Sequence, residues 1–195
     1  MTTRNAPHES PLTWANLVTC LRVTGSITCF TVAALGGGTP WNLAGLLIYW
    51  ALDSIDGFLA RALHQETRMG AQMDIIADRL LITFFYYNAL SRNPHLLLAA
   101  GLFLFQYAGP DLYLSIQFLR WPILSPNYFH RVDRRIWALN WSPVAKFSNA
   151  GLATGLIVLL GNAWLPILVC SALLVMKIYS CVLLQRVPAP EQSWV

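Results

Sequence analysis

The chain has 195 residues, of which 56% are hydrophobic and 11% charged, and its mean hydropathy is +0.50. Soluble domains carry about 25% charged residues, so this composition excludes an ordinary soluble domain and predicts a protein that crosses a membrane several times. The formal net charge of +4 is better explained by anionic lipid headgroups or phosphorylated substrates than by nucleic acid.

The chain contains six apolar segments that are long enough to cross a bilayer, because a membrane helix needs roughly 20 mainly apolar residues. In chain order they run approximately over 14–35, 41–62, 70–91, 96–119, 147–163 and 164–185. Turn-forming residues separate them, as in 36–40 and 161–164. We therefore predict an all-α fold, in which residues 1–195 form a single membrane domain with six transmembrane helices.

The first segment follows a short polar stretch, residues 1–13, and is itself interrupted by polar residues. Asn16, Thr19 and Arg22 are spaced three apart and so lie on one face of a helix. A cleaved signal peptide has an apolar core without such residues, so the pattern favours a permanent membrane helix.

The second and third segments carry four carboxylates. Asp53 and Asp56 are three apart, and Asp74 and Asp78 are four apart, so each pair lies on one face of its helix. A short loop makes the two helices antiparallel neighbours, and the pairs are expected to converge. Because a charge at the centre of a membrane helix costs about 2.5–3.5 kcal/mol, we expect these acids to bind a hard divalent cation, Mg²⁺ or Mn²⁺.

Small residues share helical faces with these acids. Gly57, Ala60 and Gly70 each lie four residues from a carboxylate and would let a ligand approach the backbone. Helix packing alone explains such small residues but does not explain the acids. Arg61 ends the second segment, where a guanidinium can clamp a phosphate. The combination indicates a substrate that carries a nucleotide diphosphate.

The long connection between the fourth and fifth segments, about 120–146, is basic. It carries Arg120, Arg131, Arg134, Arg135 and Lys146. The positive-inside rule therefore predicts that both termini, this connection and the acid pairs lie on the cytosolic side. In a bacterial cell this would be the inner membrane.

Further basic residues lie within or beside the predicted helices. We interpret Arg22, Arg79 and Lys146 as a site for a phosphorylated acceptor, because intramembrane cations normally pair or face a polar cavity. The alternative for each is a salt bridge to an acid or snorkelling to the interface. For Lys177 this alternative is at least as good.

The acids and their neighbours form a specific motif. The pattern Asp53-x-x-Asp56-Gly57-x-x-Ala60-Arg61, eight residues, then Gly70-x-x-x-Asp74-x-x-x-Asp78 resembles, without gap or substitution, the signature of the CDP-alcohol phosphotransferase family. The row at residues 16, 19 and 22 and the six predicted helices are also similar, so the resemblance covers nearly the whole chain. It implies an integral membrane enzyme, commonly a homodimer, in which an alcohol displaces CMP from a CDP-linked substrate.

The resemblance also implies roles for individual residues. Asp53, Asp56 and Asp74 would hold the metal, and Asp78 would join them or act as the base that takes the proton of the acceptor hydroxyl. The cytidine site would be lined by Gly57, Ala60 and Gly70, with Arg61 and Thr19 on the diphosphate.

The identity of the donor and acceptor is read from weaker similarities. The chain lacks the extra helices of enzymes that use CDP-choline, which favours CDP-diacylglycerol. Lys146 and the run 77–80 resemble phosphatidylglycerophosphate and cardiolipin synthases, although Pro110 departs from that branch, and residues 61–74 resemble phosphatidylinositol synthases. We expect glycerol 3-phosphate as acceptor, with inositol or inositol phosphate as the alternative.

Two other classes are less consistent with the sequence. An ion-coupled transporter would place its acids near the bilayer midplane, often within inverted repeats, whereas these acids cluster at one end of two helices and no repeat is visible. A catalytically silent lipid-binding relative would be expected to lack an acid of the motif, and all four are present.

Overall fold

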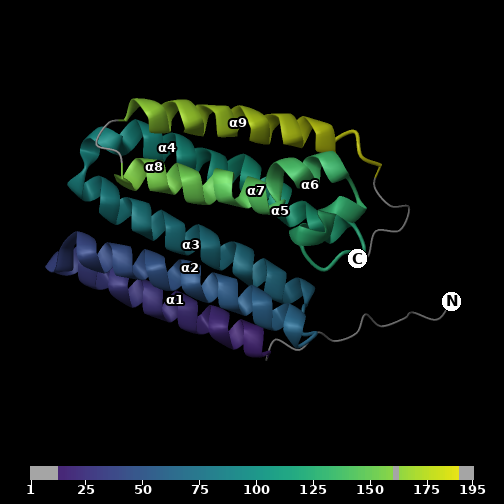
Figure 1. Cartoon of the computed structure of the whole chain (residues 1–195), viewed down its shortest axis with the longest axis horizontal. Coiled ribbons are helices and arrows are strands. Elements are labelled where there is room, and N and C mark those ends of the chain that lie inside the picture. Colours follow the sequence, from purple (N-terminus) through teal and green to yellow (C-terminus); the bar gives the residue numbers. More distant parts are fainter. Residues whose placement is uncertain (1–12, 160–162, 189–195) are drawn as a thin grey trace. The chain divides into compact units, whose positions relative to one another are not determined.

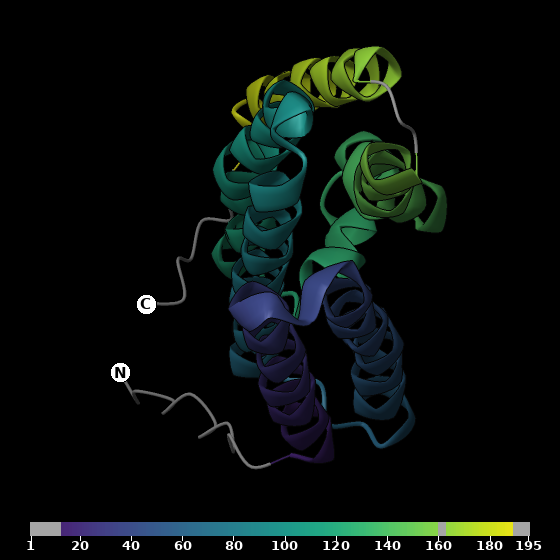
Figure 2. The same cartoon turned by 90° about the vertical axis from the view of Figure 1, so that its left-hand side faces the viewer.

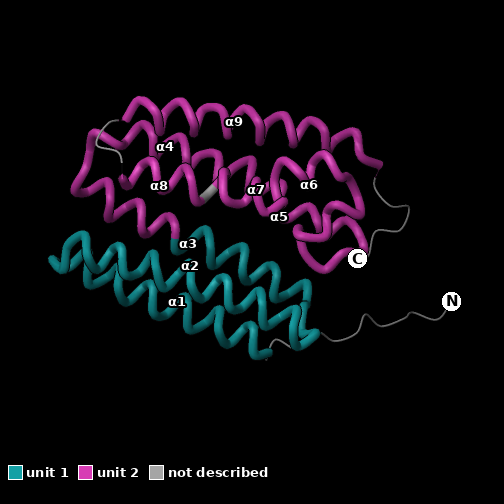
Figure 3. The backbone as a smooth tube through the Cα atoms, viewed as in Figure 1, with its two compact units in different colours: residues 1–81 teal, residues 82–195 magenta. Residues whose placement is uncertain are grey.

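The computed structural model describes residues 13–159 and 163–188, and every regular element within them is helical (Figure 1). The predicted all-α class is therefore confirmed. The chain forms two compact units, Met1–Leu81 and Ile82–Val195 (Figure 3), with the boundary inside helix α3. The single membrane domain over the whole chain stays a prediction, and the two units are described separately below.

The first unit begins with a helical hairpin. Helices α1 (Trp14–Val32) and α2 (Gly38–Ala62) are joined by a π-helical turn, η1 (Ala33–Gly37). Gly36 in this turn has φ +112, a conformation that is accessible to glycine but strained for other residues. The chain reverses there, so α1 and α2 run side by side in opposite directions (Figures 1 and 2).

The two helices of the hairpin pack closely because glycine stands at their contact. Phe30 of α1 is fully buried, and a Cβ added at Gly45 of α2 would lie 2.5 Å from its ring. The Ser26 hydroxyl donates a hydrogen bond of 3.0 Å to the Gly45 carbonyl. Such small-residue contacts let membrane helices approach each other, and this one fixes how the two helices face each other.

Helix α3 (Arg68–Arg92) follows a short loop that is anchored at both ends. The backbone N–H of Trp14 donates to Gln65 Oε1 at 3.0 Å, which ties the loop to the start of α1. Thr67 Oγ1 accepts from the Gly70 N–H at 2.9 Å, as an N-capping residue does. The start of α3, and hence the position of its acids, is set by these contacts.

The second unit contains the remainder of α3 and many shorter helical elements. They are η2 (Pro94–Leu96), α4 (Leu97–Gln106), η3 (Tyr107–Asp111), α5 (Leu112–Ile116), η4 (Gln117–Arg120), η5 (Pro126–Arg131), α6 (Arg134–Asn140), α7 (Pro143–Lys146), η6 (Phe147–Leu152), α8 (Ala153–Leu159) and α9 (Trp164–Leu184). The predicted helix 96–119 is interrupted by the π-helical η3, which contains Pro110. Proline has no N–H and its ring clashes with the preceding turn, so the regular α-helix cannot continue there.

The core of the second unit is aromatic. The rings of Tyr86 and Phe103 lie 5.0 Å apart, and those of Phe103 and Tyr107 lie 5.4 Å apart. The Tyr86 hydroxyl donates to Thr154 Oγ1 at 3.1 Å, which satisfies its polar end inside the core. This cluster links α3, α4 and α8, and α4 also packs along α9 (Figures 1 and 2).

A buried ion pair joins α9 to η3. Lys177 Nζ lies 2.5 Å from Asp111 Oδ1 and donates to Asn140 Oδ1 of α6 at 2.8 Å. Asn140 in turn donates to Ser180 Oγ at 2.9 Å. The salt-bridge interpretation of Lys177 is therefore the one that the structure supports.

Three helical stretches among the described residues are long and apolar enough to cross a membrane. They are Trp14–Ala62, which contains the whole α1–α2 hairpin, Pro94–Arg120 and Trp164–Leu184. Helix α3 is not among them, because it carries charges at Arg68, Asp74, Asp78, Arg79 and Arg92. Large apolar side chains such as Leu35 and Trp164 are more than 80% exposed, as expected for surfaces that face lipid. These features fit a membrane protein, and the count of six spans stays a prediction.

Candidate active site

The polar row of α1 faces α2 and α3. Asn16, Thr19 and Arg22 are all buried, as their three-residue spacing on one helix face allows. The Thr19 hydroxyl donates to Asp56 Oδ2 at 2.9 Å and also to the Ala15 carbonyl at 3.1 Å. The sequence singled out this row, and the structure places it against the carboxylates of the motif.

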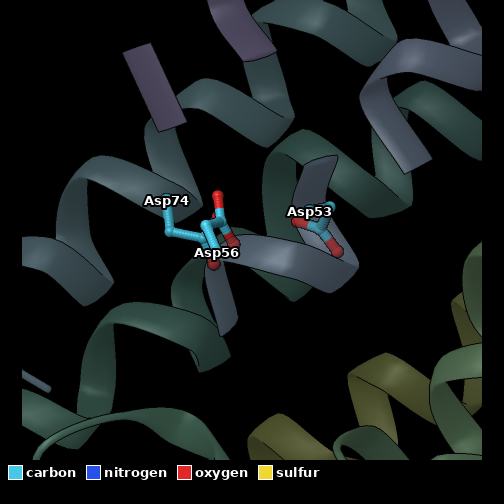
Figure 4. Close-up of side chains that lie close together, drawn as sticks. All are labelled: Asp53, Asp56 and Asp74. Carbon is cyan, nitrogen blue, oxygen red and sulfur yellow. The ribbon is translucent and has the colours of Figure 1, made fainter. Parts of the chain in front are cut away.

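Three of the four carboxylates meet at one point. One oxygen each from Asp53, Asp56 and Asp74 lies within 4.8 Å of the other two (Figure 4). The Asp53 and Asp74 side chains are 40% and 42% exposed, whereas that of Asp56 is only 7% exposed. The cluster is therefore closed around Asp56 and accessible at the other two acids, so a ligand can reach it.

Asp78 lies outside this group of three. It follows Asp74 by four residues on α3, its side chain is 21% exposed, and its Oδ1 is buried without a hydrogen-bond donor. A buried acceptor oxygen of this kind is costly unless something compensates it. Asp78 therefore lies beside the group of three with an oxygen that accepts no hydrogen bond.

The donor set fits a divalent cation. Carboxylate oxygens are the ligands preferred by Mg²⁺ and Mn²⁺, and opposite ligands of one Mg²⁺ ion lie about 4.2 Å apart. One oxygen each of Asp53, Asp56 and Asp74 lies within 4.8 Å of the other two, which is close to this range. Asp78 Oδ1, which is buried and accepts no hydrogen bond, agrees with the same conclusion.

Arg22 contacts all four acids. Its Nη1 forms an ion pair with Asp53 Oδ1 and lies 3.7 Å from Asp56 Oδ2 and 3.5 Å from Asp78 Oδ1, while its Nη2 lies 2.6 Å from Asp74 Oδ1. The Arg22 side chain is fully buried, and its Nε has no hydrogen-bond partner. The sequence favoured a role for Arg22 at the acceptor and gave a salt bridge to an acid as the alternative, and the structure shows the salt bridges.

The glycines of the motif differ in their surroundings. A Cβ at Gly57 would first meet Arg61 Nη1 at 3.4 Å, and Arg61 is an exposed and flexible side chain. A Cβ at Gly70 would lie 2.9 Å from both Asn16 Oδ1 and Thr67 Oγ1. Gly70 is therefore required for packing against α1, whereas the space at Gly57 is bordered by the movable guanidinium of Arg61. Ala60 is half-buried on α2.

The three residues predicted for the acceptor fall in different units. Arg22 and Arg79 belong to the first unit, where Arg79 is half-buried and directly follows Asp78 on α3. Lys146 is exposed at the end of α7 in the second unit. Their grouping around one acceptor stays a prediction.

The arrangement defines a class of protein: a helical protein that fits a membrane, with a polar site whose clustered carboxylates suit a cation. The family model of CDP-alcohol phosphatidyltransferases matches residues 12–176, and the chain belongs to this family. The matched range includes every residue of the candidate site. No curated protein and no solved structure matches the chain.

Membership of the family confirms the resemblance on which the sequence interpretation relied. The family consists of phosphotransferases of phospholipid biosynthesis, which transfer a phosphatidyl group from a CDP-alcohol. The match is to the family as a whole and names no branch within it.

Proposed function

We propose that the protein transfers a phosphatidyl group from CDP-diacylglycerol to glycerol 3-phosphate and releases CMP. The observation that carries this proposal is the approach of oxygens from Asp53, Asp56 and Asp74 to within 4.8 Å of one another inside the family motif. A diphosphate substrate needs such a site, because its charge must be neutralised before CMP can leave.

The nucleotide part of the donor is assigned to the residues beside the acids. Gly57 and Ala60 of α2, together with Gly70 of α3, border the cytidine, and this placement is supported at Gly57, where the nearest atoms to an added Cβ belong to the movable Arg61 guanidinium. Arg61 projects over Gly57, where its guanidinium can contact the diphosphate in a bidentate manner. Thr19, which donates to Asp56, completes the set on the α1 side.

The reaction is a displacement at phosphorus. A divalent cation held by Asp53, Asp56 and Asp74, with Asp78 as a further ligand in the alternative assignment, would neutralise charge on the diphosphate and on the departing CMP. Asp78 accepts the proton of the acceptor hydroxyl, the hydroxyl oxygen forms the new bond to phosphorus, and the bond from phosphorus to the CMP oxygen breaks. General-base assistance of this kind contributes about 10²–10⁴-fold to the rate.

The choice of acceptor rests on positive charge. An anionic acceptor would be attracted by the positive charges of Arg22, Arg79 and Lys146, and glycerol 3-phosphate is the acceptor that the resemblance to phosphatidylglycerophosphate synthases supports. Inositol or inositol phosphate is the second candidate, which is supported by the run 61–74 and by Arg79 directly after the last acid.

The membrane arrangement completes the proposal. We assign six spans to α1, α2, α3, the stretch 94–120, the stretch 147–163 and α9, of which residues 160–162 lie outside the described part. The excess of arginine and lysine in 120–146 supports a cytosolic position for this connection and for the acids. A homodimer is proposed from the family resemblance alone.

The test is release of CMP by the purified protein with CDP-diacylglycerol and Mg²⁺, in parallel with glycerol 3-phosphate, inositol, inositol phosphate, serine and choline. Release with glycerol 3-phosphate alone is the expected result, and release with an inositol acceptor alone would establish the alternative. An Asp78→Asn variant should release little CMP, and Arg92→Gln, a change at the other end of α3, should behave as the wild type. No release with any acceptor from folded protein would overturn the proposal.

A further inference from the structure

Arg22 is the one cation that contacts all four acids among the described residues. From its position we infer that Arg22 is a built-in counter-ion, which takes the cation position among the four aspartates in the metal-free protein and is displaced when a divalent cation binds. The inference rests on the proposed metal site and adds Arg22 as a residue that controls the metal affinity of that site.

The distances place a single nitrogen of Arg22 among several carboxylates. Nη1 pairs with Asp53 and lies 3.7 Å and 3.5 Å from oxygens of Asp56 and Asp78. Nη2 reaches Asp74 at 2.6 Å. Two of the three acids that approach within 4.8 Å of one another therefore surround Nη1, and the third holds Nη2. A cation shared by these acids would bind the same carboxylates.

Charge explains why a cation must be present in the metal-free site. Four neighbouring carboxylates repel one another, and an uncompensated buried charge is strongly unfavourable. The Arg22 side chain is fully buried, and its Nε has no hydrogen-bond partner, so its stabilisation comes from the acids. Arginine has five donors and no lone pair to offer, which means that it cannot become a ligand of the metal.

Arg22 and the metal are therefore competitors for the carboxylates. When the metal binds, the guanidinium must give up at least part of its contacts, and it then becomes available to an anion. Its predicted contact with a phosphorylated acceptor would follow metal entry for this reason.

A role of Arg22 in orienting the carboxylates would predict the opposite change in metal affinity when Arg22 is replaced. If Arg22 stayed in place and only oriented the ligands, its removal would leave the carboxylates misplaced and would weaken metal binding. If it competes, its removal eliminates a rival cation and increases the repulsion that a metal relieves. Binding of the metal should then become tighter.

The experiment measures Mn²⁺ binding to the purified full chain in detergent, from the loss of the electron paramagnetic resonance signal of free Mn²⁺. For Arg22→Gln we expect a dissociation constant at least about tenfold lower than that of the wild type, since a positive charge within 4 Å of the ligands is removed. Arg22→Lys keeps the charge and should stay close to the wild type. Arg92→Gln removes the same charge 14 residues beyond Asp78 on α3, about 21 Å along the helix, and should change nothing.

Weaker or unchanged Mn²⁺ binding by Arg22→Gln would overturn the inference and leave the metal site standing. Absence of Mn²⁺ binding by both the wild type and the variant would instead remove the proposed metal site, and the inference with it.

A second measurement keeps the test valid if Arg22→Gln does not fold. Wild-type protein with isotope-labelled arginine guanidinium groups is titrated with Mg²⁺ and followed by nuclear magnetic resonance, and the Arg22 signal is identified by its absence in Arg22→Lys. The Arg22 signal should shift as Mg²⁺ binds, while the Arg92 signal stays in place. A stationary Arg22 signal at saturating Mg²⁺ would refute displacement.

Discussion

Replacing Gly57 with alanine should weaken ligand binding without lowering the stability of the fold. The three atoms nearest to the added Cβ would all belong to the Arg61 guanidinium, starting at 3.4 Å, and this side chain is exposed and can move away. Gly57 lies inside α2, where alanine favours the helix by about 1 kcal/mol over glycine. Gly57→Ala should therefore melt at the same temperature as the wild type or slightly higher.

The same methyl group should obstruct the nucleotide. Overpacking a filled contact by a methyl or methylene group costs about 1–3 kcal/mol, which corresponds to a loss of about 5- to 150-fold in affinity. We expect Gly57→Ala to bind CDP more weakly by a factor in this range. Calorimetric titration with CDP in the presence of Mg²⁺ measures it, and thermal melting without ligand gives the stability of the same sample.

Gly70→Ala is the matched control. Its Cβ would lie 2.9 Å from Asn16 Oδ1 and from Thr67 Oγ1, so Asn16, which is buried on α1, would have to shift. The expected effect is a fall in the free energy of unfolding of about 1–3 kcal/mol, with a lower melting temperature. Gly57→Ala should thus lose affinity for CDP at unchanged stability, whereas Gly70→Ala should lose stability.

Either of two results would contradict a role of Gly57 in nucleotide binding. Wild-type affinity for CDP in Gly57→Ala would show that the space at Gly57 is not used by the nucleotide. A marked fall in the melting temperature of Gly57→Ala would show that Gly57, like Gly70, serves packing.

Three further outcomes are expected. Asp74→Asn should abolish CMP release while it melts within a few degrees of the wild type, because it removes one oxygen ligand, and a near-normal rate would contradict the placement of the metal. Treatment with a chelator should stop CMP release and added Mg²⁺ should restore it, whereas full activity after exhaustive chelation would exclude a required metal. Lys177→Met should lower the free energy of unfolding by about 3 kcal/mol, since it removes the buried cation that pairs with half-buried Asp111. Lys177→Met with Asp111→Leu should recover most of the loss, and an additive loss in the double variant would show that the pair is not coupled.

The sequence could predict which residues of the site share a helix face, because this follows from their spacing. Spacings of three and four place Asp53 with Asp56 and Asp74 with Asp78 on single helix faces, and the short loop between the helices brings the pairs near each other. The structure brings Asp53, Asp56 and Asp74 together as the spacing indicates. The helical class followed in the same way from the length and composition of the apolar segments.

Contacts between distant segments could not be predicted in this way. The pairing of Arg22 with acids 31 and 52 residues away depends on the rotation of α1 about its axis, which is set by contacts such as that of Phe30 with Gly45. Lys177 and Asp111 meet only because η3 and α9 lie together. The short helices between residues 120 and 146 carry no long apolar period, so only their charge could be recognised in advance.

The pairing of Arg22 with Asp53 has a consequence for how the chain enters the membrane. Both residues belong to the α1–α2 hairpin, so their ion pair can form once residues 14–62 have left the ribosome, before the acids of α3 exist. A hairpin that carries its own paired charges avoids part of the cost of inserting each charge alone. The order of synthesis therefore supplies Asp53 with a partner from the outset, and the later acids arrive at a site in which a positive charge is already present.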